Sequence, residues 1–240
     1  MEEVFVKKIL VSDYDDTLFI DEEGIKENIK LLKKWMRKKN IVVIATGRSY
    51  YDMMKEIKKY KIPYHFLILN HGATILDKDD EILYSEAISK NTKEQLRKDL
   101  ELSSAKFYFC CCHLESRVSL YANNLTKIHI EYATKEQALE KIELIRKYYS
   151  GRVRAFYLHD GIIEVVSDGC SKCLGVTWLL EYLNVDDYKM YVIGNGYTDI
   201  DMVRNYHGYC MKSAVEPLKE VATKEYDKVS TLLKEVMEQK

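Results

Sequence analysis

The sequence has little of what marks several broad classes of protein. Its 240 residues include only two prolines, Pro63 and Pro217, and ten glycines, too few for a collagen-like or low-complexity chain. No apolar run approaches the roughly 20 residues that a membrane span requires. The first residues, Met-Glu-Glu-Val, lack the basic segment that opens a secretory signal. We therefore expect a cytoplasmic protein with no membrane partner.

The chain also lacks an excess of charge of either sign. It has 37 Lys and Arg residues against 38 Asp and Glu, which gives a net charge of -1. This balance indicates no electrostatic attraction to nucleic acid. The hydrophobic fraction of 47% and the charged fraction of 31% are typical of a globular protein that buries a sizeable core. We expect no nucleic-acid partner, and the sequence makes no prediction of oligomeric state.

The six cysteines show no zinc-site spacing. Three are consecutive, at 110–112, and Cys170 with Cys173 forms one C-x-x-C pair that no second pair accompanies. Cys210 stands alone. We expect buried or half-buried reduced thiols in preference to a metal or redox site.

The most informative stretch lies near the N-terminus. An apolar run at 9–11, of the kind that a buried parallel strand needs, ends in Asp13, Asp15 and Asp16, followed by Thr17. In an open α/β sheet the carboxyl ends of the strands face the ligand crevice. Adjacent carboxylates repel one another, so a hard divalent cation with oxygen ligands, above all Mg²⁺, is the expected occupant. The competing interpretation is an ordinary polar turn after a strand.

Further apolar runs repeat this pattern of strand followed by polar turn. They lie at 41–45, 66–69 and 190–193, and helix-like amphipathic segments separate them. Alternation of this kind predicts a parallel sheet with crossover helices. We therefore expect an α/β fold with a Rossmann-like parallel-sheet core.

The pattern differs between about residues 85 and 167. A helix at 91–102 precedes strand-like pieces, and a second helix at 134–149 precedes a closing hairpin, which reads as helix-strand-strand twice. This is the signature of an inserted α+β domain. We predict a core made of residues 1–84 and 168–240, with residues 85–167 as the insertion.

Four polar clusters fall at strand ends or helix starts of the predicted core. They are the Asp13 run, Thr46-Gly47-Arg48, Lys172, and the turn 195–199. Phosphoryl transfer uses these residue types: one carboxylate can attack phosphorus and a second can protonate the leaving oxygen. A metal ion and a lysine stabilise the charge on the phosphoryl group, and N–H groups at glycine turns bind its oxygens.

The order and type of these residues resemble the haloacid dehalogenase-like phosphatases, particularly the Cof-type branch with a C2 (C2B-like) cap. Residues 13–18 look like the first motif of that family, Asp-x-Asp-x-Thr. Residues 45–48 match the second motif, Ser171-Lys172 the third, and residues 194–199 the fourth. The inserted α+β domain lies where the cap of that family belongs.

The resemblance implies catalytic and phosphate-binding roles. Asp13 would be the nucleophile and Asp15 the general acid and base. Thr46, Gly47 and Lys172 would bind the phosphoryl group.

It also implies a Mg²⁺ site, with ligands from Asp13, the backbone carbonyl of Asp15, Asn195 and Asp199. Arg48 would either bind substrate or pack structurally, and both interpretations stay open.

Three positions depart from the family pattern. Asn195 stands where the fourth motif usually has Asp, Thr198 replaces Asn, and His71 replaces the Asn of an Asn-Gly-Ala turn. Asn195 keeps a carbonyl oxygen for coordination but removes one negative charge, so we expect weaker Mg²⁺ binding. Because Asp13, Asp15 and Lys172 are intact, catalysis is still expected.

The leading hypothesis is a Mg²⁺-dependent phosphatase that acts on a small phosphorylated metabolite such as a sugar phosphate. A phosphomutase of a related capped branch is a second possibility. A phospho-ligand-binding protein with weakened catalysis is a third. Candidate substrate contacts in the inserted domain are His113, Glu115, Arg117 and Asn123.

Overall fold

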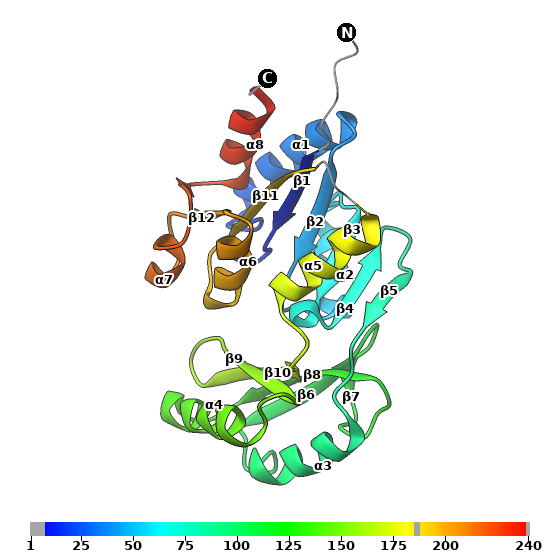
Figure 1. Ribbon diagram of the computed structural model, residues 1–240, viewed down its shortest axis with the longest axis vertical. Helices are drawn as coiled ribbons and strands as arrows, with labels where there is room; N and C mark the ends of the chain where they lie inside the picture. The colour runs from blue at the N-terminus through cyan, green and yellow to red at the C-terminus, as the bar shows by residue number, and fades with distance from the viewer. Residues whose placement is uncertain (1–7, 185–187, 239–240) are drawn as a thin grey trace.

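Two β-sheets organise the protein, and the computed structural model describes residues 8–184 and 188–238 (Figure 1). Within these ranges the larger sheet has eight strands and the smaller has five. We call the larger sheet with its helices the core, and the smaller sheet with its two helices the cap. The domain boundaries that we predict after residues 84 and 167 remain predictions. Among the residues described, every helix is too short or too polar to cross a membrane.

The core sheet has β1 at its centre. Its order is β13-β12-β11-β1-β2-β3-β4-β5; the pairs from β13 to β3 are parallel, and the last two pairs are antiparallel. The strands are β1 (Lys8–Ser12), β2 (Ile41–Ala45), β3 (Phe66–Leu69), β4 (Thr74–Asp77), β5 (Ile82–Ser85), β11 (Lys189–Gly194), β12 (Tyr209–Met211) and β13 (Glu225–Tyr226). The prediction of an α/β fold with a parallel sheet is confirmed.

Helices cover both faces of this sheet (Figure 1). They are α1 (Glu22–Arg37), α2 (Tyr50–Tyr60), α5 (Lys172–Leu183), α6 (Ile200–Asn205), α7 (Glu216–Lys219) and α8 (Val229–Glu238). Successive side chains of a strand point to opposite faces. Leu10 of β1 accordingly packs in the cluster that contains Trp35 of α1, whereas Val11 packs in the cluster that contains Val176 of α5. The chain at the end of β1 is thus fixed from both sides.

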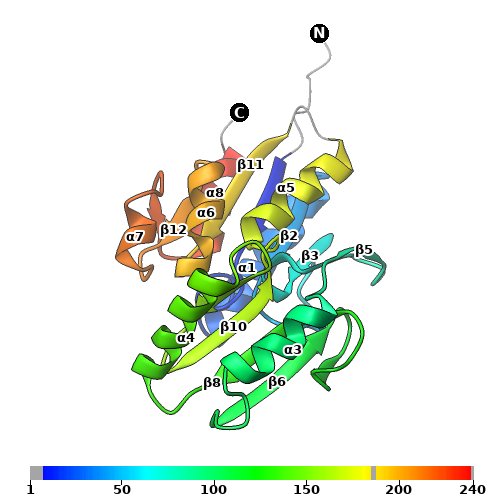
Figure 2. The ribbon, with the colours of Figure 1, turned by 60° about the horizontal axis from the view of Figure 1, so that its bottom comes forward.

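The cap sheet is antiparallel, and one of its faces carries both cap helices (Figure 2). Its order is β7-β6-β8-β10-β9. The elements are α3 (Lys90–Asp99), β6 (Phe107–Cys112), β7 (Ser116–Val118), β8 (Leu125–Glu131), α4 (Lys135–Tyr148), β9 (Val153–Tyr157) and β10 (Ile162–Ser167). Ile128 and Ile130 of β8 pack with the helices. Lys127 and His129 therefore point the other way, toward the core.

Some boundaries differ from expectation. Helix α1 begins at Glu22 rather than Gly24, because the Asp21 carboxylate caps it by accepting from the N–H groups of Glu23 and Gly24. The first half of the cap holds three strands rather than two, and the two-residue β13 had no recognisable signal. The cysteines are all buried and unpaired, as predicted.

Candidate active site

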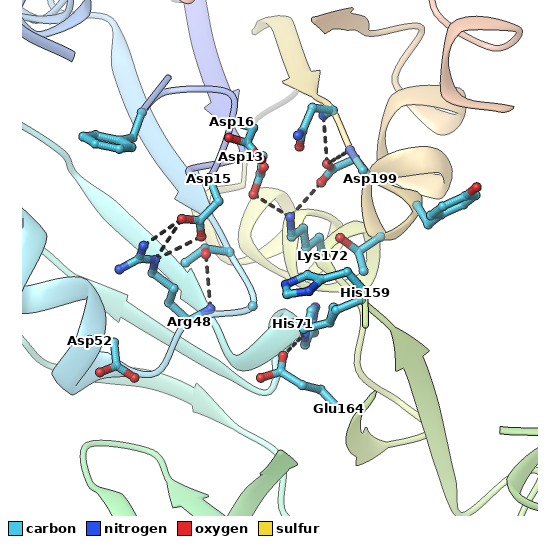
Figure 3. A pocket seen from close by; sticks show the side chains of 18 of the residues that line it. Asp13, Asp15, Asp16, Arg48, Asp52, His71, His159, Glu164, Lys172 and Asp199 are labelled. Atoms are coloured by element: carbon cyan, nitrogen blue, oxygen red, sulfur yellow. Dashed lines mark hydrogen bonds and ion pairs between the residues drawn. The ribbon is translucent and has the colours of Figure 1, made fainter. Parts of the chain in front are cut away.

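A buried lysine between two carboxylates lies at the carboxyl end of β1 (Figure 3). The Lys172 ammonium donates to Asp13 Oδ1 at 2.6 Å and to Asp199 Oδ1 at 2.8 Å. The three residues are each at most 4% exposed. Asp13 Oδ2 accepts a hydrogen bond from the Thr17 hydroxyl at 3.3 Å. The first, third and fourth predicted motifs are therefore in direct contact.

Local structure explains why Lys172 reaches this point. Lys172 is the first residue of α5, and the Ser171 hydroxyl caps the helix by accepting from Leu174 N–H at 3.1 Å. The turn at Gly72 packs against this helix start: a Cβ on Gly72 would lie 2.2 Å from the Ser171 carbonyl oxygen. Only glycine permits that approach, and its φ of +94° suits glycine as well.

The two carboxylates and one ammonium leave a surplus negative charge. Burial and the nearby Asp199 together raise the pKa of Asp13 to about 7, against the opposite effect of Lys172. Burial alone would lower the pKa of Lys172, but Asp13 and Asp199 raise it above its usual value. Lys172 is thus held as a cation beside carboxylates that repel each other, an arrangement that favours an additional cation.

Asp199 uses both of its oxygens within the protein. While Oδ1 accepts from Lys172, Oδ2 accepts from the backbone N–H groups of Asn195 at 3.0 Å and Gly196 at 2.9 Å. These bonds fix the turn that follows β11. No hydrogen bond within the described chain engages the side-chain amide of Asn195, which lines the pocket. Asn195 is therefore better placed than Asp199 to offer a free oxygen.

The second motif forms a loop directly after β2. Its backbone is held by the neighbouring turn, because Thr46 O accepts from His71 N–H at 3.1 Å and Arg48 O accepts from Asn70 N–H at 3.0 Å. The Thr46 hydroxyl accepts from Arg48 N–H at 3.1 Å. Among the described residues, none accepts from the N–H of Gly47, which leaves this group for a phosphate oxygen.

Arg48 binds Asp15, the second aspartate of the first motif. Its guanidinium donates from Nε and Nη2 to both oxygens of Asp15, at 2.7 to 3.2 Å. It also lies over the Tyr14 ring, 5.0 Å from the centroid, and 3.5 Å from Glu56. Arg48 thus lines the pocket and is packed and paired, and its binding of substrate stays a prediction.

The pocket has a volume of about 900 Å³ and lies between core and cap. All eight predicted site residues line it: Asp13, Asp15, Thr46, Gly47, Arg48, Lys172, Asn195 and Asp199. The cap contributes Phe109, Lys127, His129, Tyr157, Leu158, His159 and Glu164.

Sequence reasoning missed the cap residues that line the pocket. The candidates His113, Glu115, Arg117 and Asn123 are not among them. A signal was present, since Lys127 and His129 alternate with apolar residues along a seven-residue strand. Interpreting that alternation requires knowing that the apolar face of β8 packs against the cap helices, so that its polar face lines the pocket.

The donor atoms at the charged centre fit a hard cation. Asp13 and Asn195 line the pocket with a carboxylate and an amide oxygen, and the family resemblance implies the backbone carbonyl of Asp15 as a further ligand; all are oxygen types that Mg²⁺ accepts. Across residues 8–184 and 188–238, no group of three or more His, Cys, Asp and Glu side chains is gathered as a metal site. A site here would therefore depend on backbone and amide oxygens as well as on carboxylate.

Comparison with known proteins identifies the family of the chain. The profile of the haloacid dehalogenase-like hydrolase family matches residues 10–124 and 111–231. A protein from Buchnera aphidicola subsp. Acyrthosiphon pisum, whose phosphatase name is provisional, is 24% identical over 88% of this chain and 87% of its own.

Two solved structures share the fold over nearly the whole chain. A provisionally assigned HAD/COF-like hydrolase from Plasmodium vivax has a TM-score of 0.84 at 22% identity, covering 98% of this chain and 97% of that one. A subclass IIB sugar phosphatase has a TM-score of 0.77 at 18% identity, covering 96% and 99%. The chain therefore belongs to the haloacid dehalogenase-like hydrolases, and within them to the Cof-type phosphatases, as its motifs predicted.

Proposed function

We propose that this enzyme hydrolyses a small phosphorylated metabolite, with Asp13 as the nucleophile and Mg²⁺ as the cofactor. The observation that carries the proposal is the position of Asp13 at the end of β1, buried in the pocket and 2.6 Å from the Lys172 ammonium. A sugar phosphate is the expected type of substrate. The structural neighbour that is a sugar phosphatase supports this class, since it shares the fold of core and cap.

In the proposed reaction an Asp13 oxygen attacks phosphorus and the bond from phosphorus to the leaving oxygen breaks. The product is an acyl phosphate on Asp13, which water then hydrolyses to inorganic phosphate and the free carboxylate. Lys172 stabilises negative charge on the transferring group and orients Asp13. Asp199 holds Lys172 and, through the N–H groups of Asn195 and Gly196, the turn beside it.

Asp15 is the proposed general acid and base. It donates a proton to the leaving oxygen and later takes one from the attacking water. Because Arg48 donates to both oxygens of Asp15, a leaving oxygen has to replace Arg48 at one of them. We therefore assign Arg48 an action on substrate through Asp15.

Thr46 and Gly47 are the proposed phosphate-binding residues of the core. The hydroxyl and the free N–H of this loop can donate to phosphoryl oxygens. Asp13, the carbonyl of Asp15 and Asn195 would hold Mg²⁺, and the ion would neutralise phosphoryl charge when bound. We assign Asp199, which the family resemblance also implied as a ligand, to holding Lys172.

The test is phosphate release from a panel of phosphomonoesters, with and without Mg²⁺, by the native protein and by Asp13→Asn. We expect Mg²⁺-dependent turnover that Asp13→Asn reduces by more than about 10³-fold, as loss of a covalent nucleophile does. Beryllium fluoride should inhibit the native protein and not bind the variant. An isomerised sugar phosphate without free phosphate would instead indicate a phosphomutase. Binding of substrates with no turnover of any aryl phosphate would indicate a ligand-binding protein.

A further inference from the structure

Four ionisable side chains meet where the cap sheet lies against the phosphate-binding loop. Lys127 and His129 come from β8, Glu164 from β10, and His71 from the turn after β3. Lys127 and His71 are 2% exposed and Glu164 is 5% exposed. The proposed reaction gives none of them a role.

Glu164 accepts a hydrogen bond from each of the other three. Its Oε1 accepts from Lys127 Nζ at 2.7 Å and from His129 Nδ1 at 2.9 Å, and its Oε2 accepts from His71 Nε2 at 2.5 Å. Burial lowers the pKa of His71 against the opposite effect of Glu164, which favours the neutral imidazole. Burial alone would raise the pKa of Glu164, but Lys127 and the two imidazoles hold it well below its usual value. The cluster is therefore a buried, balanced ion pair with two imidazole partners.

This cluster contacts the loop that carries Thr46 and Gly47 from more than one side. Lys127 Nζ donates to the Gly47 carbonyl at 2.6 Å. A Cβ on Gly47 would lie 2.5 Å from His71 Cε1 and 3.2 Å from Glu164 Oε2, so the loop rests directly on the His71–Glu164 pair. His71 N–H in turn donates to the Thr46 carbonyl. One cap lysine and one pair that joins cap to core thus determine where the Gly47 backbone lies.

We propose that Lys127 and Glu164 are positioning residues of the cap, which fix the Gly47 carbonyl and so orient the phosphate donors of residues 46 and 47. The inference rests on the function proposed above. Its consequence is that phosphate affinity depends on cap side chains that do not bind phosphate, so the loop is complete only with the cap seated on it.

The test compares two variants with a matched control. Lys127→Met removes the bond to Gly47, and Lys127→Met/Glu164→Gln also removes the charge that the first change leaves buried, which protects folding. Lys93→Met is the control, because Lys93 is also buried and also donates to a backbone carbonyl at 2.6 Å, that of Ala122, wholly within the cap. The readouts are kcat/KM, the inhibition constant of inorganic phosphate, and hydrogen exchange at the amides of Thr46, Arg48 and His71.

In both Lys127 variants kcat/KM should fall by about 30- to 100-fold, as displacement of binding groups by roughly 1 Å can cause. The inhibition constant of phosphate should rise by about tenfold, a change of about 1.4 kcal/mol. Exchange at the loop amides should accelerate in both variants, and Lys93→Met should change none of the three readouts.

The outcomes separate the two proposals. If the native protein hydrolyses no phosphomonoester, the proposed function fails, while the exchange experiment still tests the positioning role. If the double variant folds with unchanged loop exchange and unchanged phosphate inhibition, the positioning role is wrong. A rise only in the KM of a larger substrate would also overturn it, because Lys127 would then bind the leaving group.

Discussion

Two buried lysines line the same pocket as the phosphate-binding loop, and their surroundings differ in charge. Lys172 contacts two carboxylates, those of Asp13 and Asp199. Lys127 contacts one carboxylate, that of Glu164, and a backbone carbonyl. The first group carries a surplus negative charge and the second is balanced. The unbalanced group can bind a further cation, whereas the balanced group can only fix the position of the chain.

The two carboxylates in this comparison show that burial alone does not set a pKa. Asp13 and Glu164 are 4% and 5% exposed, yet the pKa of Asp13 is raised to about 7 and that of Glu164 is held well below its usual value. The difference lies in the neighbours, because Asp13 shares its lysine with a second carboxylate and Glu164 has two imidazole donors besides its own lysine. A buried carboxylate whose pKa is raised is typical of a reacting group, and a buried carboxylate whose charge is fully paired is typical of a structural group.

After loss of the Asp13 nucleophile, the largest expected effect concerns Lys172. Lys172→Ala should lower kcat by about 10²- to 10³-fold, since one preorganised charge at the reacting group is removed. Lys172→Arg should restore little, because a planar guanidinium does not replace a compact ammonium between two carboxylates. Phosphate release at saturating substrate checks both, with Lys93→Ala as the control. Activity near the native value in Lys172→Ala would place this lysine outside the reaction.

The group around Lys172 could be predicted from the sequence, and the group around Lys127 could not. Asp13, Lys172 and Asp199 each follow a strand or open a helix at a recognisable motif, so the parallel topology alone predicts that they meet. Lys127 and Glu164 belong to strands of the cap, and only the packing of cap on core brings them to Gly47. Side-chain direction in those strands depends on which face the cap helices cover, which no local pattern specifies.

The next expected effect is on stability. Glu164→Gln leaves the Lys127 charge buried without its partner and should destabilise the protein by about 3–5 kcal/mol. Asp13→Asn relieves repulsion with Asp199 and should leave the melting temperature unchanged or raised. Urea unfolding of both variants beside the native protein checks the contrast. Equal losses in the two would mean that charge balance does not distinguish the two groups.

Lowering the pH should reduce the loss of stability that Glu164→Gln causes. The folded pKa of Glu164 is depressed, so the stability it contributes is present above its unfolded value of about 4.5 and is lost as the pH falls through the folded value. The difference in unfolding free energy between native protein and Glu164→Gln should therefore shrink as the pH is lowered below about 4.5. A difference that stays constant to the lowest pH at which both fold would contradict the assignment.

The smallest expected effect concerns the metal site beside Lys172 and tests whether Asn195 is one of its ligands. If Asn195 holds the metal, it does so with a neutral amide oxygen, and Asn195→Asp adds one charge to the ligand set. The Mg²⁺ concentration for half-maximal activity should then fall by about tenfold, a change of about 1.4 kcal/mol in binding free energy. Activity at saturating Mg²⁺ need not rise with affinity, because the added anion also repels the phosphoryl group.

The matched control is Ser213→Asp, which places the same charge on the exposed wall of the same pocket. That charge attracts Mg²⁺ only through the field of the pocket, which solvent screens. A much larger shift in Asn195→Asp than in Ser213→Asp therefore identifies Asn195 as a ligand. Equal shifts would mean that the pocket responds only to its total charge. An unchanged or higher Mg²⁺ requirement in Asn195→Asp would remove Asn195 from the metal site and return the ligand role to Asp199.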